Sequence, residues 1–137
     1  MLNVANQSWG LTILRVIVGV VFVVHGWQKV FVFGFHGVTA MFGHMGVPAP
    51  AIAAPLIALI ELIGGAALIL GFGTRVASLL LAADMAGAIL FVHFKNGFFG
   101  PKGFEYPLTL LAACLCLALA GGGASSMEGM VGRRKRG

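Results

Sequence analysis

Long hydrophobic runs, each with few polar interruptions, dominate the pattern of the chain. Four apolar segments stand out, at 11–33, 51–72, 75–94 and 104–120. As helices they would be roughly 25 to 35 Å long at 1.5 Å per residue, which matches the ~30 Å hydrocarbon core of a bilayer. They lack two-residue alternation, and lipid tolerates only helices or closed barrels. We therefore expect four membrane-spanning helices.

The linker between the first two segments has a shorter helical period of its own. In "HGVTAMFGHMGVPAP", four apolar residues recur at i, i+3, i+4 and i+7: Val38, Met41, Phe42 and Met45. This spacing predicts a short amphipathic helix on the outer face of the membrane. His36 and His44 would then be ordinary interfacial histidines. The predicted fold is an all-α integral membrane four-helix bundle with this interfacial helix between helices 1 and 2.

Local signals fix the expected helix ends. Ser8 is a candidate N-cap for the first helix and Thr74 for the third, while Pro107 suits the first turn of the fourth. We place the helices at about 9–33, 51–72, 75–94 and 104–121, in one transmembrane domain covering 1–137. Small residues at Gly64, Gly65, Ala83 and Gly87 predict close helix approach.

Composition supports the membrane and charge orients the chain within it. Hydrophobic residues make up 59% and charged residues 9%, whereas a soluble domain carries roughly 25% charged residues. Four of the nine cations lie in Arg133–Arg136, inside a basic tail at 122–137. Basic ends favour the cytoplasmic side, so we expect a multi-pass inner-membrane protein with both termini cytoplasmic. No basic stripe with interleaved aromatics predicts nucleic-acid binding.

Several ionisable residues interrupt the apolar segments. An ionisable side chain at the bilayer centre costs about 2.5 to 3.5 kcal/mol on insertion scales, so such residues usually face the bundle interior and find partners. On the first helix, three of them fall within an arc of about 80° at ~100° per residue. They are Arg15, His25 and Lys29.

Glu61 and Asp84 lie midway along the second and third helices. Glu61 is about 15 Å from either surface, and His25 or Lys29 could supply its partner from the first helix. Arg15 could reach Asp84 from the inner side, which makes these two residues candidates for a structural ion pair. The alternative for all of them is a network that fixes helix register.

A further polar group is expected at the outer end of the bundle. His93 ends the third helix, and the following loop and the start of the fourth helix supply Asn96, Glu105 and Tyr106. His93 is nine residues after Asp84, about 180° around a straight helix, so we expect these two to share a site only if the helix end bends. Our candidates for ligand binding or a proton relay are His25, Lys29, Glu61, His93, Asn96, Glu105 and Tyr106. We predict no metal site, since Cys114 and Cys116 point about 200° apart.

Together these segments resemble the DoxX family. The resemblance is carried by "LRVIVGVVFVVHGWQKVF", "GVPAPAIAAPLIALIELIGGAALILGFGTR", "VHFKNGFF" and "EYPLTLLAA". It implies a small bacterial or archaeal inner-membrane protein with four helices. Its name comes from quinone-linked oxidoreductase subunits, including thiosulfate:quinone oxidoreductase, so the resemblance implies a redox-linked membrane subunit with a partner subunit.

Three functions follow as hypotheses. In the first, His25, Lys29, Glu61 and His93 bind a quinone or quinol and move its protons. In the second, which we favour least, His25 and His93 are axial ligands of a haem. In the third, the polar residues form a structural network in a non-catalytic scaffold or partner-binding subunit, and the close helix faces would also allow a homodimer. The sequence carries no Cys-x-x-Cys, flavin or dinucleotide motif, so we expect no intrinsic electron carrier.

Overall fold

The computed structural model describes residues 3–123 and 125–137, and every regular element within these ranges is helical. The elements in order are α1 (Val4–Trp27), η1 (Gln28–Phe33), α2 (Gly34–Met45), α3 (Pro50–Leu70), α4 (Thr74–Ala88), η2 (Ile89–His93), η3 (Phe94–Asn96), α5 (Glu105–Ala120) and α6 (Met127–Arg134). Both η1 and η2 are π-helical, and η3 is a single 3₁₀ turn. The predicted all-α bundle with a short helix after the first span is therefore confirmed.

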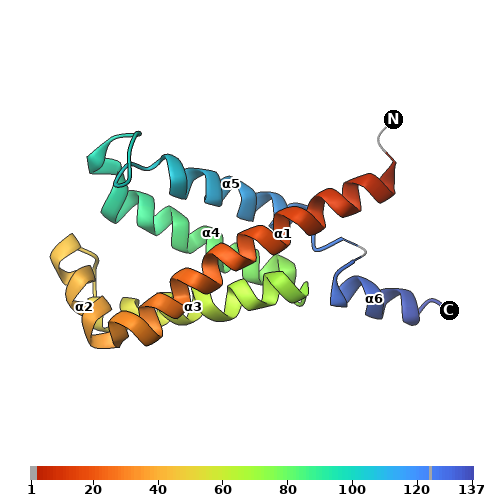
Figure 1. Cartoon of the computed structure of the whole chain (residues 1–137), viewed down its shortest axis with the longest axis horizontal. Helices are drawn as coiled ribbons and strands as arrows, with labels where there is room; N and C mark the ends of the chain where they lie inside the picture. Colours follow the sequence, from red (N-terminus) through yellow and green to blue (C-terminus); the bar gives the residue numbers. More distant parts are fainter. Residues whose placement is uncertain (1–2, 124) are drawn as a thin grey trace.

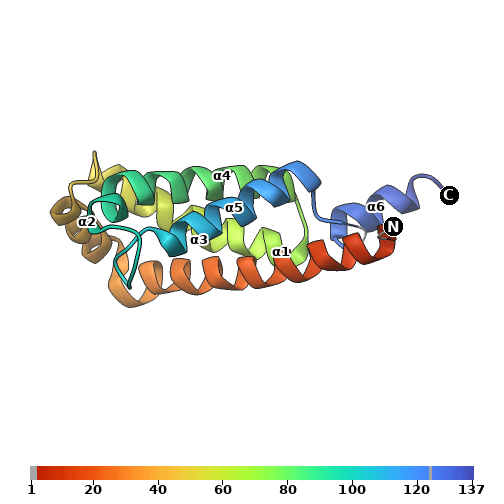
Figure 2. The same cartoon turned by 90° about the horizontal axis from the view of Figure 1, so that it is seen from above.

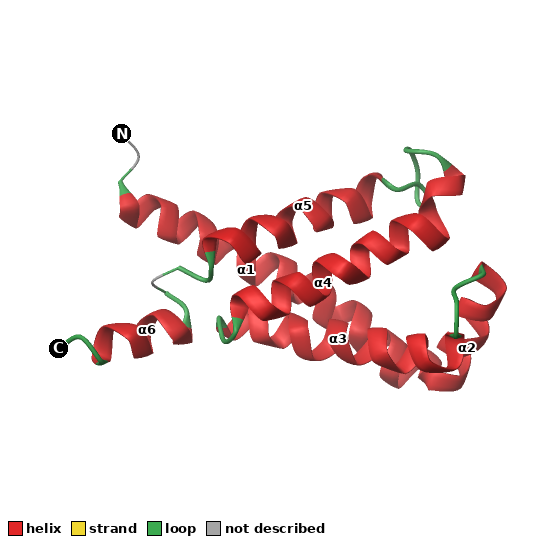
Figure 3. Cartoon of the chain, turned by 180° about the vertical axis from the view of Figure 1, so that it is seen from behind, coloured by secondary structure: helices red, strands yellow, loops and turns green. Residues whose placement is uncertain are grey.

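The bundle consists of two helix pairs. α1 packs mainly on α3 and α4 mainly on α5, while contacts of α3 with α4 and of α1 with α5 join the pairs. Figures 1 and 2 show an elongated molecule with both chain ends at one end and α2 at the other. Seen from behind, α4 and α5 run side by side in front of α1 (Figure 3).

Three helical stretches of the described chain are long and apolar enough to cross a membrane: Val4–Met45, Pro50–Leu70 and Thr74–Asn96. α5 is apolar but has 16 residues, about 24 Å at 1.5 Å per residue. Large apolar side chains on the outside of the bundle are exposed by more than half, for example Ile17 (60%), Ile63 (65%) and Val76 (66%). Such an apolar exterior is favourable in contact with lipid acyl chains and unfavourable in contact with water.

α1 and α3 approach closely because glycines lie between their backbones. A Cβ atom built on Gly19 would lie 2.7 Å from the carbonyl oxygen of Gly65. A Cβ on Gly26 would overlap the backbone of Leu62. Because glycine has no side chain, the two backbones can lie close together, as small residues allow between helices in lipid. Of the small residues expected at such contacts, Gly65 lies here, whereas a Cβ on Gly87 would meet no atom within 4 Å.

Both predicted N-caps are wrong. α1 begins one turn earlier, at Val4, where the Asn3 side chain accepts a hydrogen bond from the Ala5 amide at 3.3 Å. Thr74 is the first helical residue of α4, and Gly73 precedes it in the left-handed conformation at φ 57°. Gly73 takes the cap position because its missing Cβ permits that conformation.

The basic tail contains a folded helix that the sequence reading left out. Ser126 caps α6 by accepting a hydrogen bond from the Gly129 amide at 3.0 Å, and it is fully buried. The Glu128 amide donates to the Gly71 carbonyl at 3.2 Å, which ties α6 to the turn between α3 and α4. A sequence signal existed: a serine cap, an acidic first turn and a basic last turn match the helix dipole.

Candidate functional site

An ion pair between α3 and the start of η1 is the first element of the site. The Lys29 ammonium nitrogen lies 2.6 Å from Glu61 Oε2, and the two side chains are 19% and 5% exposed. Lys29 stands on η1 and Glu61 midway along α3. The sequence left His25 and Lys29 open as partners of Glu61, and the structure pairs Glu61 with Lys29.

A cavity of about 550 Å³ opens beside this pair. Its walls are mostly apolar and come from α1, η1, α2, α3, α4, η2 and α5 and from the adjoining loops. The polar side chains that border it are His25, Lys29, Glu61, Asp84, His93 and Tyr106. Five of the seven predicted site residues thus line one cavity. The size and the apolar walls are typical of a small-ligand pocket.

Asp84 belongs to this cavity and not to an ion pair with Arg15. Its carboxyl group lies near enough to Glu61 and Lys29 to interact with both. Its Oδ2 atom is buried and has no hydrogen-bond partner. From the sequence, Asp84 was predicted to form a structural ion pair with Arg15 and not to belong to the site. Its spacing of 23 residues from Glu61 across one tight turn, with both at mid-span, was the available signal.

Arg15 lies at the other end of the bundle. Its Nη1 atom donates to the carbonyl oxygens of Leu68 and Ile69 at 2.9 and 3.0 Å. These carbonyls belong to the last turn of α3, where a helix dipole favours a cation. The predicted Arg15–Asp84 contact is therefore wrong, because the end of α3 supplies nearer acceptors.

Asp84 and His93 line the same cavity, contrary to the expectation from a straight helix. The reason is η2, in which Ile89–His93 wind with the wider π-helical turn. A π turn contains one more residue than an α turn, so it shifts every later side chain around the helix axis. The same deviation occurs at η1, which carries Lys29. Each of the two π-helical segments therefore carries a residue that borders the cavity.

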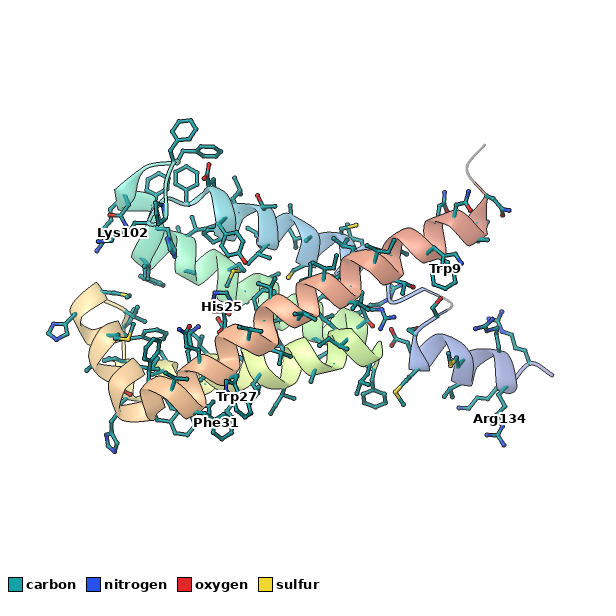
Figure 4. The ribbon with its side chains drawn as sticks, in the orientation of Figure 1. Trp9, His25, Trp27, Phe31, Lys102 and Arg134 are labelled. Atoms are coloured by element: carbon teal, nitrogen blue, oxygen red, sulfur yellow. The ribbon has the colours of Figure 1, made fainter. Side chains whose placement is uncertain are left out.

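The two histidines of the cavity are oriented by backbone carbonyls. His25 Nδ1 lies 2.8 Å from the Val21 carbonyl oxygen, and His93 Nδ1 lies 3.0 Å from that of Lys102. Figure 4 shows His25 on the side of α1 that faces α4, whereas Trp27 and Phe31 lie on the opposite side. The one polar face expected on the first helix thus turns inward at this level.

Of the residues predicted around the loop between η3 and α5, some border the cavity and others hold the loop in place. Asn96 donates from Nδ2 to the carbonyls of Val92 and Lys102 at 3.1 and 3.2 Å, so it closes the loop after η3. Tyr106 borders the cavity at the start of α5. Glu105 is half-buried at the first position of α5 and does not border the cavity. Its carbonyl accepts from the Thr109 hydroxyl.

α2 covers one side of the cavity. Three of its four expected apolar residues border the cavity, namely Met41, Phe42 and Met45, and Val38 is buried beneath. His36 and His44 are exposed on its other surface. The amphipathic helix therefore turns its apolar face to the bundle and forms a wall of the site.

Comparison with known proteins agrees with this architecture. The DoxX family model matches residues 10–94, which include most of α1, all of α2 and α3, and the cavity residues Glu61, Asp84 and His93. The chain belongs to the DoxX family. Among similar proteins is one of Bacillus subtilis named "Putative oxidoreductase CatD", which is 38% identical over 96% of this chain and 95% of its own length.

Two other DoxX relatives are named as membrane proteins. Inner membrane protein YqjF of Escherichia coli is 32% identical, over 93% of this chain and 96% of its own length. Uncharacterized membrane protein Rv3486 of Mycobacterium tuberculosis is 31% identical, over 88% of this chain and 80% of its own length. No solved structure matches this DoxX chain. Family, relatives and apolar helices agree that the protein resides in a membrane.

Proposed function

We propose that this DoxX protein is an inner-membrane subunit of a redox system and that its outer-half cavity binds the ring of a quinone or quinol. One observation carries the proposal: polar groups able to bond two ring oxygens border a largely apolar cavity of about 550 Å³ at one end of a membrane bundle. A quinone needs this combination, because its ring oxygens form hydrogen bonds while its ring and tail need apolar walls.

The polar groups also suit proton exchange. Glu61, Asp84 and Lys29 interact with one another in a largely buried cluster. His25 and His93 border the same cavity, and an imidazole ring nitrogen can accept or donate a hydrogen. A ligand that gains or loses protons with its electrons would find acceptors here. The relative CatD is named as an oxidoreductase, which fits this role.

In this proposal the electrons come from elsewhere. The sequence carries no flavin, dinucleotide or Cys-x-x-Cys motif. The chain would therefore supply the membrane site, and a partner subunit would supply the electron carrier. We propose that both termini face the cytoplasm, since the basic end of α6 and Arg75 lie at the chain-terminal end of the bundle. Fluorescence of a green fluorescent protein fused after Gly137 reports that orientation, and a dark fusion contradicts it.

A cavity-blocking variant tests the binding proposal. Gly87 borders the cavity, and a Cβ atom added there meets no atom within 4 Å, so Gly87→Leu places a side chain where the first added carbon has open space. Gly10 is equally open but lies near the start of α1, which makes Gly10→Leu a matched control. Each protein is purified from bacterial membranes in mild detergent, and its organic extract is analysed for quinones by mass spectrometry relative to phospholipid.

We expect quinone enriched in the wild type and in Gly10→Leu, and reduced about tenfold in Gly87→Leu, which corresponds to about 1.4 kcal/mol of binding. Equal quinone in all three proteins, at the level of bulk lipid, would contradict the proposal. That result would favour a scaffold whose interior is a structural network.

A further inference from the structure

Lys29 and Tyr106 can donate hydrogen bonds into the cavity, and the other four polar side chains around it present acceptors to a ligand. His25 illustrates why: its Nδ1 lies 2.8 Å from the carbonyl oxygen of Val21. A carbonyl oxygen only accepts, so Nδ1 must carry the hydrogen of this contact. In the neutral ring the remaining nitrogen, Nε2, then has a lone pair and is an acceptor.

His93 has the same arrangement on the facing helix pair. Its Nδ1 lies 3.0 Å from the Lys102 carbonyl oxygen, so the neutral ring again leaves Nε2 as an acceptor. His25 comes from α1 and His93 from η2, and both border the cavity. Two backbone carbonyls from different parts of the chain thus select the same tautomer at both histidines.

Asp84 adds a buried carboxyl oxygen without a donor. The side chain is 9% exposed, borders the cavity, and its Oδ2 has no hydrogen-bond partner. The Lys29 ammonium donates to Glu61 Oε2 at 2.6 Å, and none of the described donors forms a hydrogen bond with Asp84 Oδ2. Burying an acceptor without a donor is unfavourable, so a ligand that brings a donor gains more here than one that brings another acceptor.

We propose that the cavity recognises the reduced, dihydroxy form of its ligand, and that Asp84 accepts a hydrogen bond from one of the ring hydroxyls. This inference rests on the proposed quinone or quinol site. A quinol presents two O–H donors, which match Asp84 and one histidine Nε2. The oxidised quinone presents carbonyl oxygens, whose lone pairs would face the lone pairs of the same groups. The proposed event is ligand binding alone, and no electron is transferred in it.

The test compares the two redox forms of one ligand on the full chain. The protein is reconstituted in phosphatidylcholine nanodiscs, and ubiquinol-1 and ubiquinone-1 are titrated calorimetrically under anaerobic conditions, with empty nanodiscs as the blank. We expect the quinol to bind the wild type about tenfold or more tightly than the quinone, since a site built for a donor rejects the analogue that lacks it.

Variants assign the preference to Asp84. Asp84→Asn keeps the shape but offers an amide that can donate or accept, so the preference should fall to about twofold or less. Ser78→Ala is the matched control, because Ser78 is also buried on α4 with an unpartnered oxygen but does not border the cavity. Its preference should equal that of the wild type.

The outcomes are distinct. Quinone binding as tight as quinol binding in the wild type would overturn this inference and leave the proposed site intact, whether or not Asp84→Asn folds. A preference that persists in Asp84→Asn would overturn the role of Asp84. Binding of neither form above the blank would remove the proposed quinone site itself.

Discussion

Lys29 is accommodated inside an apolar bundle because its ammonium group meets Glu61 at 2.6 Å. Helix periodicity and depth predicted that Glu61 needs a partner from the first helix. They could not choose between His25 and Lys29, because both lie on the same face and η1 changes the winding where Lys29 begins to project. The Arg15 prediction failed for a related reason, since backbone carbonyls of Leu68 and Ile69 compete as acceptors and leave no mark in the sequence.

The Lys29–Glu61 ion pair should contribute to the stability of the bundle. Removing one partner leaves a buried charge unpaired, so Glu61→Gln should lower the free energy of unfolding by about 3 to 5 kcal/mol. The double variant Lys29→Met with Glu61→Gln removes both charges and should recover part of that loss. Thermal melting in detergent, followed by circular dichroism, measures both.

Lys95→Met provides the control, since Lys95 is exposed on η3 and its substitution should change stability little. The single variant Lys29→Met is measured alongside. If the double variant loses as much free energy of unfolding as Glu61→Gln and Lys29→Met together, the two charges do not stabilise each other.

Among the elements, the long α-helices could be predicted and the departures from them could not. Hydrophobic runs identified the region of every span, yet the α-helical period cannot indicate a π segment, so the shared placement of Asp84 and His93 was missed. α6 was missed because its eight residues have no apolar period long enough to stand out. Small residues predicted close approach of helices in general, but neither the contact of α1 with α3 nor the glycines of α1 that make it were identified.

The contact between α1 and α3 gives a second stability prediction. Gly26→Ala places a methyl group into the Leu62 backbone, so the helices must separate, at a cost of about 1 to 3 kcal/mol for overpacking. Gly10→Ala adds the same methyl group to the same helix in open space. We therefore expect a lower melting temperature for Gly26→Ala and an unchanged or slightly higher one for Gly10→Ala. Equal melting temperatures would show that the backbones are not in close contact at Gly26.

At the scale of the whole molecule, the membrane bundle could be predicted from the sequence, but the cavity could not. Composition and segment lengths were sufficient to predict a membrane bundle with an even number of passes, and the chain ends do lie together (Figure 1). The cavity depends on how α2 folds back and on how η2 turns His93, and both are tertiary effects. The seven predicted site residues accordingly divide into five that border the cavity and two, Asn96 and Glu105, that do not.

The most direct measurement of the central claim is an experimental structure of the protein purified from its own membranes in mild detergent. We expect ring-shaped density in the cavity, in contact with Asp84 and with His25 or His93, and a tail that leaves between the helices. A cavity that contains only ordered water or lipid acyl chains, in a preparation that retains its native quinone pool, would contradict the account.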